Sequence, residues 1–268
     1  MTNTNPKVLQ IVNLLAIIST IIFNALVNII PLNGVTSGEV SDFYPSLFTP
    51  PGYVFSIWGV IYTLLGIFIV YQLRSSQREM DYLQEISFLY LIGAVFNISW
   101  LILFHYSYGV ASLFVFTPLF IVGLLVVLLF TYVRLGIGIK HVTRGVKLAV
   151  HLPVSVYLGW ISLATIANTA SVLNEVIVGI PLAVQEMWTS AVLVIALILS
   201  LLMLVLRRDF AFNLVVIWAS VGIATKQAAS LLIYGTALGV AIILAIAIVV
   251  LPLVRKRPFG GFYIEIVE

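Results

Sequence analysis

Long apolar runs constrain this chain more than any other feature of its sequence. A helix needs about 20 predominantly apolar residues to cross the hydrocarbon core of a bilayer. Runs of about this length recur along the whole chain, at roughly 7–30, 51–73, 84–104, 109–133, 146–173, 188–206, 210–226 and 229–254. The seventh run is the shortest. The pattern predicts an all-α polytopic membrane protein with about eight transmembrane helices.

The composition agrees with a membrane location. The 268 residues are 62% hydrophobic and 9% charged, whereas a soluble domain carries about 25% charged residues. The basic residues lie in short loops and not on one face, so the positive net charge does not indicate a nucleic-acid partner. Cysteine is absent, which excludes disulfides, thiolate metal sites and cysteine nucleophiles. We predict an integral membrane protein whose first partner is the lipid bilayer.

The loops between the runs differ in charge. If the chain crosses about eight times, nearly all Lys and Arg residues fall in the loops on one side, and the opposite loops carry acidic residues. The first group is Lys7, Arg74, Arg78, Arg134, Lys140, Arg144, Lys147, Arg207, Arg208, Arg255, Lys256 and Arg257, and the second is Glu39, Asp42, Glu175 and Glu186. Lys226 is the exception. Because basic loops stay in the cytoplasm, both termini are predicted to be cytoplasmic.

Aromatic side chains are regularly spaced at the start of the second run. Pro50 and Pro51 end a loop and suit the first turn of a helix, which needs no backbone N–H. Phe55, Trp58 and Tyr62 follow at three- and four-residue steps, so their rings lie along one helical face. Such a face can pack against another helix, anchor the helix at the membrane interface or line a ligand pocket.

Two amides fall inside the third and fifth runs, each close to a tryptophan. Asn97 is three residues before Trp100, and Asn168 follows Trp160 and Ala164 at four-residue steps. An amide in hydrocarbon must find a hydrogen-bond partner or face a cavity. The spacing therefore leaves two alternatives open: a pocket with apolar walls and a few orienting hydrogen bonds, or hydrogen bonds that only join helices.

Catalytic patterns are sparse. His105, His141 and His151 are not at metal-ligand spacing, so we predict neither a metal site nor catalytic residues. No acidic residue is predicted deep in the membrane, because Glu85 lies at an interface, and this argues against a proton- or sodium-coupled carrier. Lys226 has no buried counter-ion and is interpreted as a helix end and not as a Schiff-base lysine.

Three segments, taken in order, resemble the translocator protein/tryptophan-rich sensory protein (TspO/MBR) family. The family pattern is approximately PPxxVFxxxWxxxY, then NxxW, then LPxxxxxxWxxxATxxN…LN. The chain corresponds to it at Pro50–Tyr62, with one residue fewer between Phe55 and Trp58, and matches it at Asn97–Trp100 and Leu152–Asn174. The resemblance implies a five-helix transmembrane bundle over residues 1–174. Residues 175–257 would then hold about three additional transmembrane helices, and residues 258–268 a cytoplasmic tail.

The resemblance also implies a function. Members of this family bind porphyrins and other flat hydrophobic ligands in a pocket between the second, third and fifth helices. The positions of this chain that match the motifs are Trp58, Tyr62, Asn97, Trp100, Trp160 and Ala164. We therefore expect a receptor or sensor without enzymatic activity that needs no cofactor and takes a tetrapyrrole as ligand. A prokaryotic cell membrane is the expected location, and a homodimer is left open.

The chain departs from the family pattern at several points. Phe48 replaces a tryptophan that usually precedes the double proline, and Leu113–Val115 lacks an acidic residue often found there. The segment Ser171–Glu175 lacks the Tyr and basic residue of the cholesterol-recognition pattern, which argues against cholesterol binding. The helices after Glu175 have no counterpart in the five-helix pattern.

These additional helices support an alternative function, a transporter or exporter of small hydrophobic molecules. In that case their polar side chains should point toward the five-helix bundle, whereas in a lipid-facing wall or a dimer contact they should lie near helix ends. The side chains concerned are Ser190, Ser200, Asn213, Ser220, Thr225, Gln227 and Ser230.

Overall fold

The structure, a computed structural model, describes residues 4–254, and within this range it contains helices and loops but no strand. The predicted tail at 258–268 lies outside the described residues. The α-helices are α1 (Pro6–Ile29), α2 (Ser37–Phe43), α3 (Ile57–Gln72), α4 (Tyr82–Ile86), α5 (Leu89–Tyr106), α6 (Ala111–Phe114), α7 (Thr117–Arg134), α8 (Arg144–Val146), α9 (Leu152–Val176), α10 (Leu182–Arg207), α11 (Phe210–Lys226) and α12 (Leu231–Val254). Short 3₁₀ turns lie at Leu32–Gly34 (η1), Gly52–Ser56 (η2) and Ser75–Gln77 (η3), and a π-helical turn at Lys147–His151 (η4).

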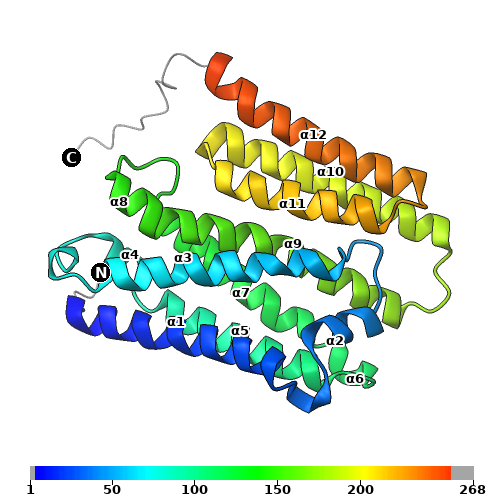
Figure 1. The fold of residues 1–268 in the computed structure, drawn as a ribbon, viewed down its shortest axis with the longest axis horizontal. Helices are drawn as coiled ribbons and strands as arrows, with labels where there is room; N and C mark the ends of the chain where they lie inside the picture. Colours follow the sequence, from blue (N-terminus) through cyan, green and yellow to red (C-terminus); the bar gives the residue numbers. More distant parts are fainter. Residues whose placement is uncertain (1–3, 255–268) are drawn as a thin grey trace.

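The prediction of an all-α polytopic membrane protein is confirmed. Seven helical segments of the described chain are long and apolar enough to cross a membrane. The eighth crossing predicted from the sequence corresponds to α11, whose 17 residues are apolar but fewer than in those seven segments. The start of α1 and the last described turn of α12 lie at the same end of the molecule (Figure 1). We name the two ends by their side chains: Arg74, Arg134, Lys140 and Arg207 at the basic end, and Glu39, Asp42, Glu175 and Glu186 at the acidic end.

Several helix boundaries differ from the sequence prediction. The helix predicted at 84–104 is wrong in its first part: Ser87, with a φ of 49°, separates α4 from α5, which begins at Leu89. The helix predicted from 188 begins at Leu182, because Pro181 precedes its first turn. The double proline leads into the 3₁₀ turn η2, and the α-helix starts only at Ile57.

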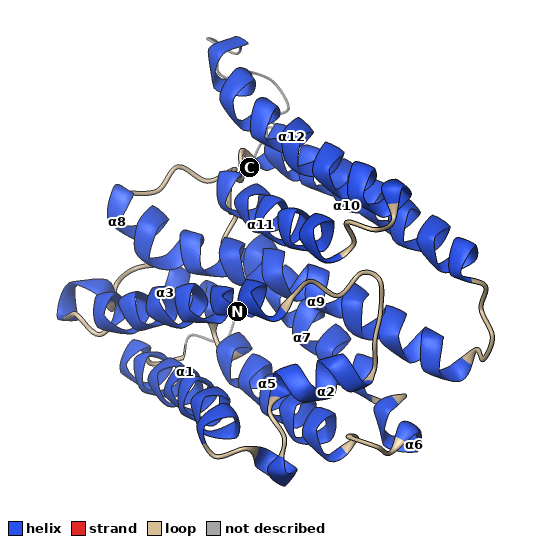
Figure 2. Ribbon diagram, turned by 45° about the vertical axis from the view of Figure 1, so that its right-hand side comes forward, coloured by secondary structure: helices blue, strands red, loops and turns tan. Residues whose placement is uncertain are grey.

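Five helices form a ring. Each packs against two neighbours in the order α1, α3, α9, α7 and α5, and α5 returns to α1. The remaining long helices form a separate layer on one side of this ring (Figures 1 and 2). In this layer α11 packs against α9 and η2, while α10 and α12 pack against α11 and against each other.

Polar contacts join the helices at the basic end. Gln72 on α3 donates to the Gln10 carbonyl oxygen at 3.1 Å, and Asn13 donates to the Gln72 side chain at 3.1 Å. All three side chains are buried, so these hydrogen bonds pair amide groups that would otherwise be costly in an apolar environment, although Oδ1 of Asn13 has no partner.

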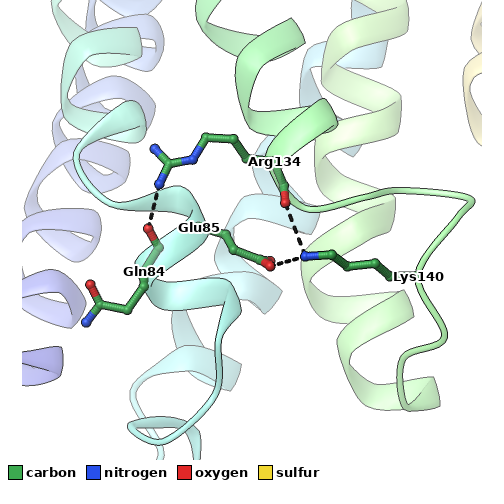
Figure 3. Close-up of polar contacts among 4 residues, drawn as sticks. All are labelled: Gln84, Glu85, Arg134 and Lys140. Carbon is green, nitrogen blue, oxygen red and sulfur yellow. Dashed lines mark hydrogen bonds and ion pairs between the residues drawn. The ribbon is translucent and has the colours of Figure 1, made fainter. Parts of the chain in front are cut away.

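A second set of contacts at the basic end joins α4 to the end of α7 and the loop after it (Figure 3). Lys140 forms an ion pair with Glu85, and Arg134 donates to the Gln84 carbonyl oxygen at 2.9 Å. The Lys140 side chain is half exposed, and such surface ion pairs contribute little to stability. The two contacts, Lys140 with Glu85 and Arg134 with Gln84, instead fix the position of the short helix α4.

The contact between α11 and η2 is close. A Cβ atom on Gly222 would lie 2.3 Å from Cγ2 of Val54, so only glycine permits this approach. Trp218 donates its indole N–H to the Val54 carbonyl oxygen at 3.0 Å, and Gln227 donates to the Leu47 carbonyl oxygen at 3.1 Å. The segment around the double proline is therefore held between the ring and α11.

Candidate ligand cavity

A cavity of about 370 Å³ lies inside the ring toward the acidic end. Its volume falls within the range of about 300–1,000 Å³ that is typical of small-molecule sites. We call it the central cavity. Its walls come from α1, α3, α5 and α9, from α2 and the loop after it, and from Ala219 and Ile223 of α11. One wall of the site is thus supplied by the additional helices.

Five of the six predicted site residues line this cavity: Trp58, Tyr62, Trp100, Trp160 and Ala164. Asn97 is not among the lining residues. It is fully buried, accepts a hydrogen bond from Asn24 of α1 at 2.6 Å and donates to the Tyr157 hydroxyl of α9 at 3.3 Å. Asn97 therefore joins three helices behind the cavity wall, as in the second alternative left open by its sequence position.

The aromatic side chains of the cavity contact one another. Trp58 and Tyr62 are stacked, with ring centroids 5.5 Å apart and planes inclined by 20°, and Trp58 meets Trp160 edge to face at 6.2 Å. Trp100 and Phe104 are stacked at 4.8 Å. Such contacts stabilise the rings in fixed orientations, so the walls present flat apolar faces.

The amide of Asn168, which lines the cavity, is satisfied by protein groups. It donates to the Thr117 hydroxyl at 2.9 Å and accepts from the Trp100 indole N–H at 3.4 Å. Asn168 therefore positions the Trp100 ring. Trp160 is different: it is 2% exposed, and its indole N–H has no hydrogen-bond partner in the described structure. A buried unpaired donor costs about 1–3 kcal/mol, so this N–H is an unsatisfied group in the wall of the cavity.

Helix α2 covers the acidic end of the cavity, where Thr36, Ser37 and Ser41 contribute to its lining. Ser37 contacts Nε2 of His105 at 3.3 Å, and Nδ1 of His105 lies 2.8 Å from the Leu101 carbonyl oxygen. Because a carbonyl oxygen only accepts, Nδ1 carries the proton, and Nε2 accepts from the serine hydroxyl. His105 thus fastens α2 to α5.

Several residues that line the central cavity are not among those predicted from the sequence. Asn24 and Asn28 line the cavity from α1, and their spacing of four places both on one helical face, which is a signal visible in the sequence. The contributions of α2 and α11 have no such local signal, because they depend on which helices become neighbours.

The side chains that line the central cavity suit the binding of a ligand. Among the described residues, no charged side chain and no histidine lines the central cavity, and no group of three His, Asp or Glu side chains could hold a metal. The available groups are aromatic and aliphatic faces, hydroxyls and amides.

Together these features define a polytopic helical membrane protein with an aromatic-walled cavity inside a five-helix ring. The sequence model of the TSPO-like protein family matches residues 10–250, and the chain belongs to this family. The match includes α10, α11 and most of α12, the helices that have no counterpart in the five-helix pattern. No curated protein and no solved structure matches the chain.

Proposed function

We propose that the protein is a membrane receptor or sensor that binds a porphyrin or another flat hydrophobic molecule in the central cavity. The observation that carries this proposal is the convergence of Trp58, Trp100 and Trp160, from three helices, on one uncharged cavity. Membership of the TSPO-like family, which indicates a membrane sensing or binding role, supports it.

The distribution of polar groups supports a ligand with one polar edge. The aromatic walls offer large apolar contact areas for a flat ring system. Amide and hydroxyl groups of Asn28, Ser37 and Ser41 gather near α2. A flat ring system placed between the tryptophans, with a polar edge toward the hydroxyl and amide groups near α2, would match both parts of the site.

The alternative function, an exporter, is less well supported. None of the seven polar side chains considered for helices α10 to α12 lines the central cavity. Thr225 and Gln227 instead contact Tyr53 and the Leu47 carbonyl oxygen at the acidic end. Thr225 and Gln227 thus lie near helix ends, as a supporting wall requires, whereas Ser200, Asn213 and Ser220 are buried within the protein.

Fluorescence titration tests the proposal. The purified protein is titrated with protoporphyrin IX beside a Trp58→Leu/Trp160→Leu double variant and a Trp188→Leu control, whose side chain does not line the central cavity. We expect saturable quenching with a micromolar midpoint in the wild-type protein and in the control. We expect it to be lost in the double variant while circular dichroism shows that the variant remains folded.

Non-saturable quenching of equal size in all three proteins would indicate partitioning of the porphyrin into detergent and would overturn the proposal. An uptake assay in liposomes would then test the exporter.

A further inference from the structure

A second cavity lies outside the ring. It is also about 370 Å³ in volume and is enclosed by α9, by the first turns of α10 and by the loop at Ser46–Phe48. We call it the lateral cavity. Because α10 forms one side of it, this cavity cannot exist in a bundle made of the first five spanning helices alone.

Helix α9 separates the two cavities. Ala164, Ala167 and Asn168 face the central cavity, whereas Ile166, Thr169 and Ala170 line the lateral cavity from the other side of the helix. Phe48 is the one residue of the described chain that lines both cavities, and it is 2% exposed. The lateral cavity is therefore a separate compartment and not a branch of the central site.

The lateral cavity has its two amide side chains at the acidic end, whereas its hydroxyl groups are spread along its length, on Ser46, Thr165, Thr169 and Thr189. The deepest hydroxyl on α9, that of Thr165, donates to the Ile161 carbonyl oxygen at 2.7 Å.

Asn174 and Gln185 line the lateral cavity near the acidic ends of α9 and α10. Ile166 lies eight residues deeper on α9, a distance of about 12 Å along a helix with a rise of 1.5 Å per residue. Val192 of α10 lines the cavity at a similar depth. Of the two amides, Asn174 donates to the Pro45 carbonyl oxygen at 3.2 Å and Gln185 to the Ile180 carbonyl oxygen at 3.0 Å.

The cavity is accessible from the bilayer. Leu173 and Trp188, which line it, are 42% and 48% exposed, and both belong to membrane-crossing helices. Tryptophan is enriched at the level of the lipid headgroups, which agrees with the place of Trp188 two turns into α10. In the hydrocarbon region beside these helices the available molecules are lipid tails and not water.

We propose that the lateral cavity binds one acyl chain of a bilayer phospholipid. The chain runs from the interface at Trp188 down to Ile166 and Val192, and the ester and headgroup region lies beside Asn174 and Gln185. The placement of Asn174 and Gln185 at the acidic end, with Ile166 and Val192 deeper in the cavity, carries this assignment, because a lipid has its polar part at the interface and its chains below. The inference does not depend on a porphyrin in the central cavity.

Photo-crosslinking tests the proposal. The full-length protein is reconstituted in liposomes that contain a phosphatidylcholine with a diazirine halfway along one acyl chain, and the labelled residues are mapped by mass spectrometry. We expect saturable labelling concentrated on Ile166, Ala170 and Val192. An Ala170→Phe variant, which fills the cavity, should lose this labelling. The matched control is Ala191→Phe, an exposed position of α10 that does not line the cavity and should retain it.

A second filling variant, Val192→Trp, repeats the test from α10 if Ala170→Phe does not fold. The wild-type map is decisive by itself. Labelling spread evenly over exposed side chains of α10 and α12, such as Leu199 and Ile243, would mean annular lipid only and would overturn the proposal. Unchanged labelling of Ile166 and Ala170 in a folded filling variant would overturn it as well.

Discussion

Asn97 and Trp160 lie close to the same cavity but have opposite hydrogen-bonding states. Asn97 is outside the lining and bonded to Asn24 and Tyr157, whereas Trp160 lines the cavity with an unpaired N–H. Replacement of the first should therefore affect folding, and replacement of the second should affect binding.

An Asn97→Val substitution leaves the Tyr157 hydroxyl without the Asn97 amide donor and removes one of the two acceptors of the Asn24 amide, the other being the Thr20 carbonyl oxygen. We expect a loss of about 1–3 kcal/mol in the free energy of unfolding and an unchanged affinity for protoporphyrin IX. Thermal unfolding and the fluorescence titration measure the two quantities. A folded variant with weakened binding and unchanged stability would contradict this assignment.

A Trp160→Phe substitution keeps an aromatic ring and removes the N–H. If the N–H donates to the bound ligand, the affinity should fall by about 1 kcal/mol, which is about fivefold. The stability of the ligand-free protein should not fall for lack of this hydrogen bond, because the donor has no partner there. Trp188→Phe is the control, since Trp188 does not line the central cavity. An equal fall in affinity in both variants would show that the N–H has no specific role.

At the scale of elements, the packing of α11 against η2 depends on Gly222. A Gly222→Val substitution places a side chain where the nearest atom of Val54 would be 2.3 Å from Cβ, so α11 must move away. Over-packing of this kind costs about 1–3 kcal/mol. We expect a lower unfolding temperature and weaker porphyrin binding, because Ala219 and Ile223 move with the helix. Gly235→Val on α12, where a Cβ meets nothing within 4 Å, is the control and should change neither quantity.

The capping box at the start of α2 gives a pH dependence. The backbone N–H and hydroxyl of Thr36 donate to the Glu39 carboxylate and hold the pKa of this exposed group below its usual value. Because the pKa of Glu39 is lowered in the folded state, the ionised carboxylate stabilises α2 at pH values above the usual carboxyl range. This stabilisation is lost as the pH falls through the lowered pKa. Hydrogen exchange at 37–43, corrected for intrinsic rates, should therefore increase below about pH 4. In the Glu39→Gln variant the side chain at position 39 does not titrate, so hydrogen exchange at 37–43 should show no such increase.

The sequence predicts the long helices because each is a continuous apolar run, and it predicts one face of the site because Trp58 and Tyr62 are one helical turn apart. The break at Ser87 has no equally strong signal, since the residue sits between two apolar segments. The role of Asn97 is not predictable from spacing, because Asn24 and Tyr157 are distant in sequence. The same holds for Ala219 and Ile223, which are ordinary apolar residues until α11 meets the ring.

At the scale of the whole molecule, the ring and the layer formed by α10 to α12 are joined through the exposed loop at 177–181, in which Val178 is 92% exposed. We expect a chain divided after Val178 to assemble from two co-expressed fragments. The first fragment alone should be unstable in detergent, because the Val54 and Leu47 carbonyl oxygens lose their donors, Trp218 of α11 and Gln227 directly after it. Size-exclusion chromatography and thermal unfolding of the fragments, alone and together, measure this. A first fragment as stable as the intact protein would show that the layer contributes nothing to the ring.

The wall that Ala219 and Ile223 add to the central cavity belongs to the same chain as the other walls. A wall supplied by a second subunit would be present only above a certain protein concentration. Covalent connection replaces that dependence with a fixed effective concentration. The composition of this site is therefore independent of how much protein the membrane holds, and ligand affinity should be the same in sparse and crowded bilayers.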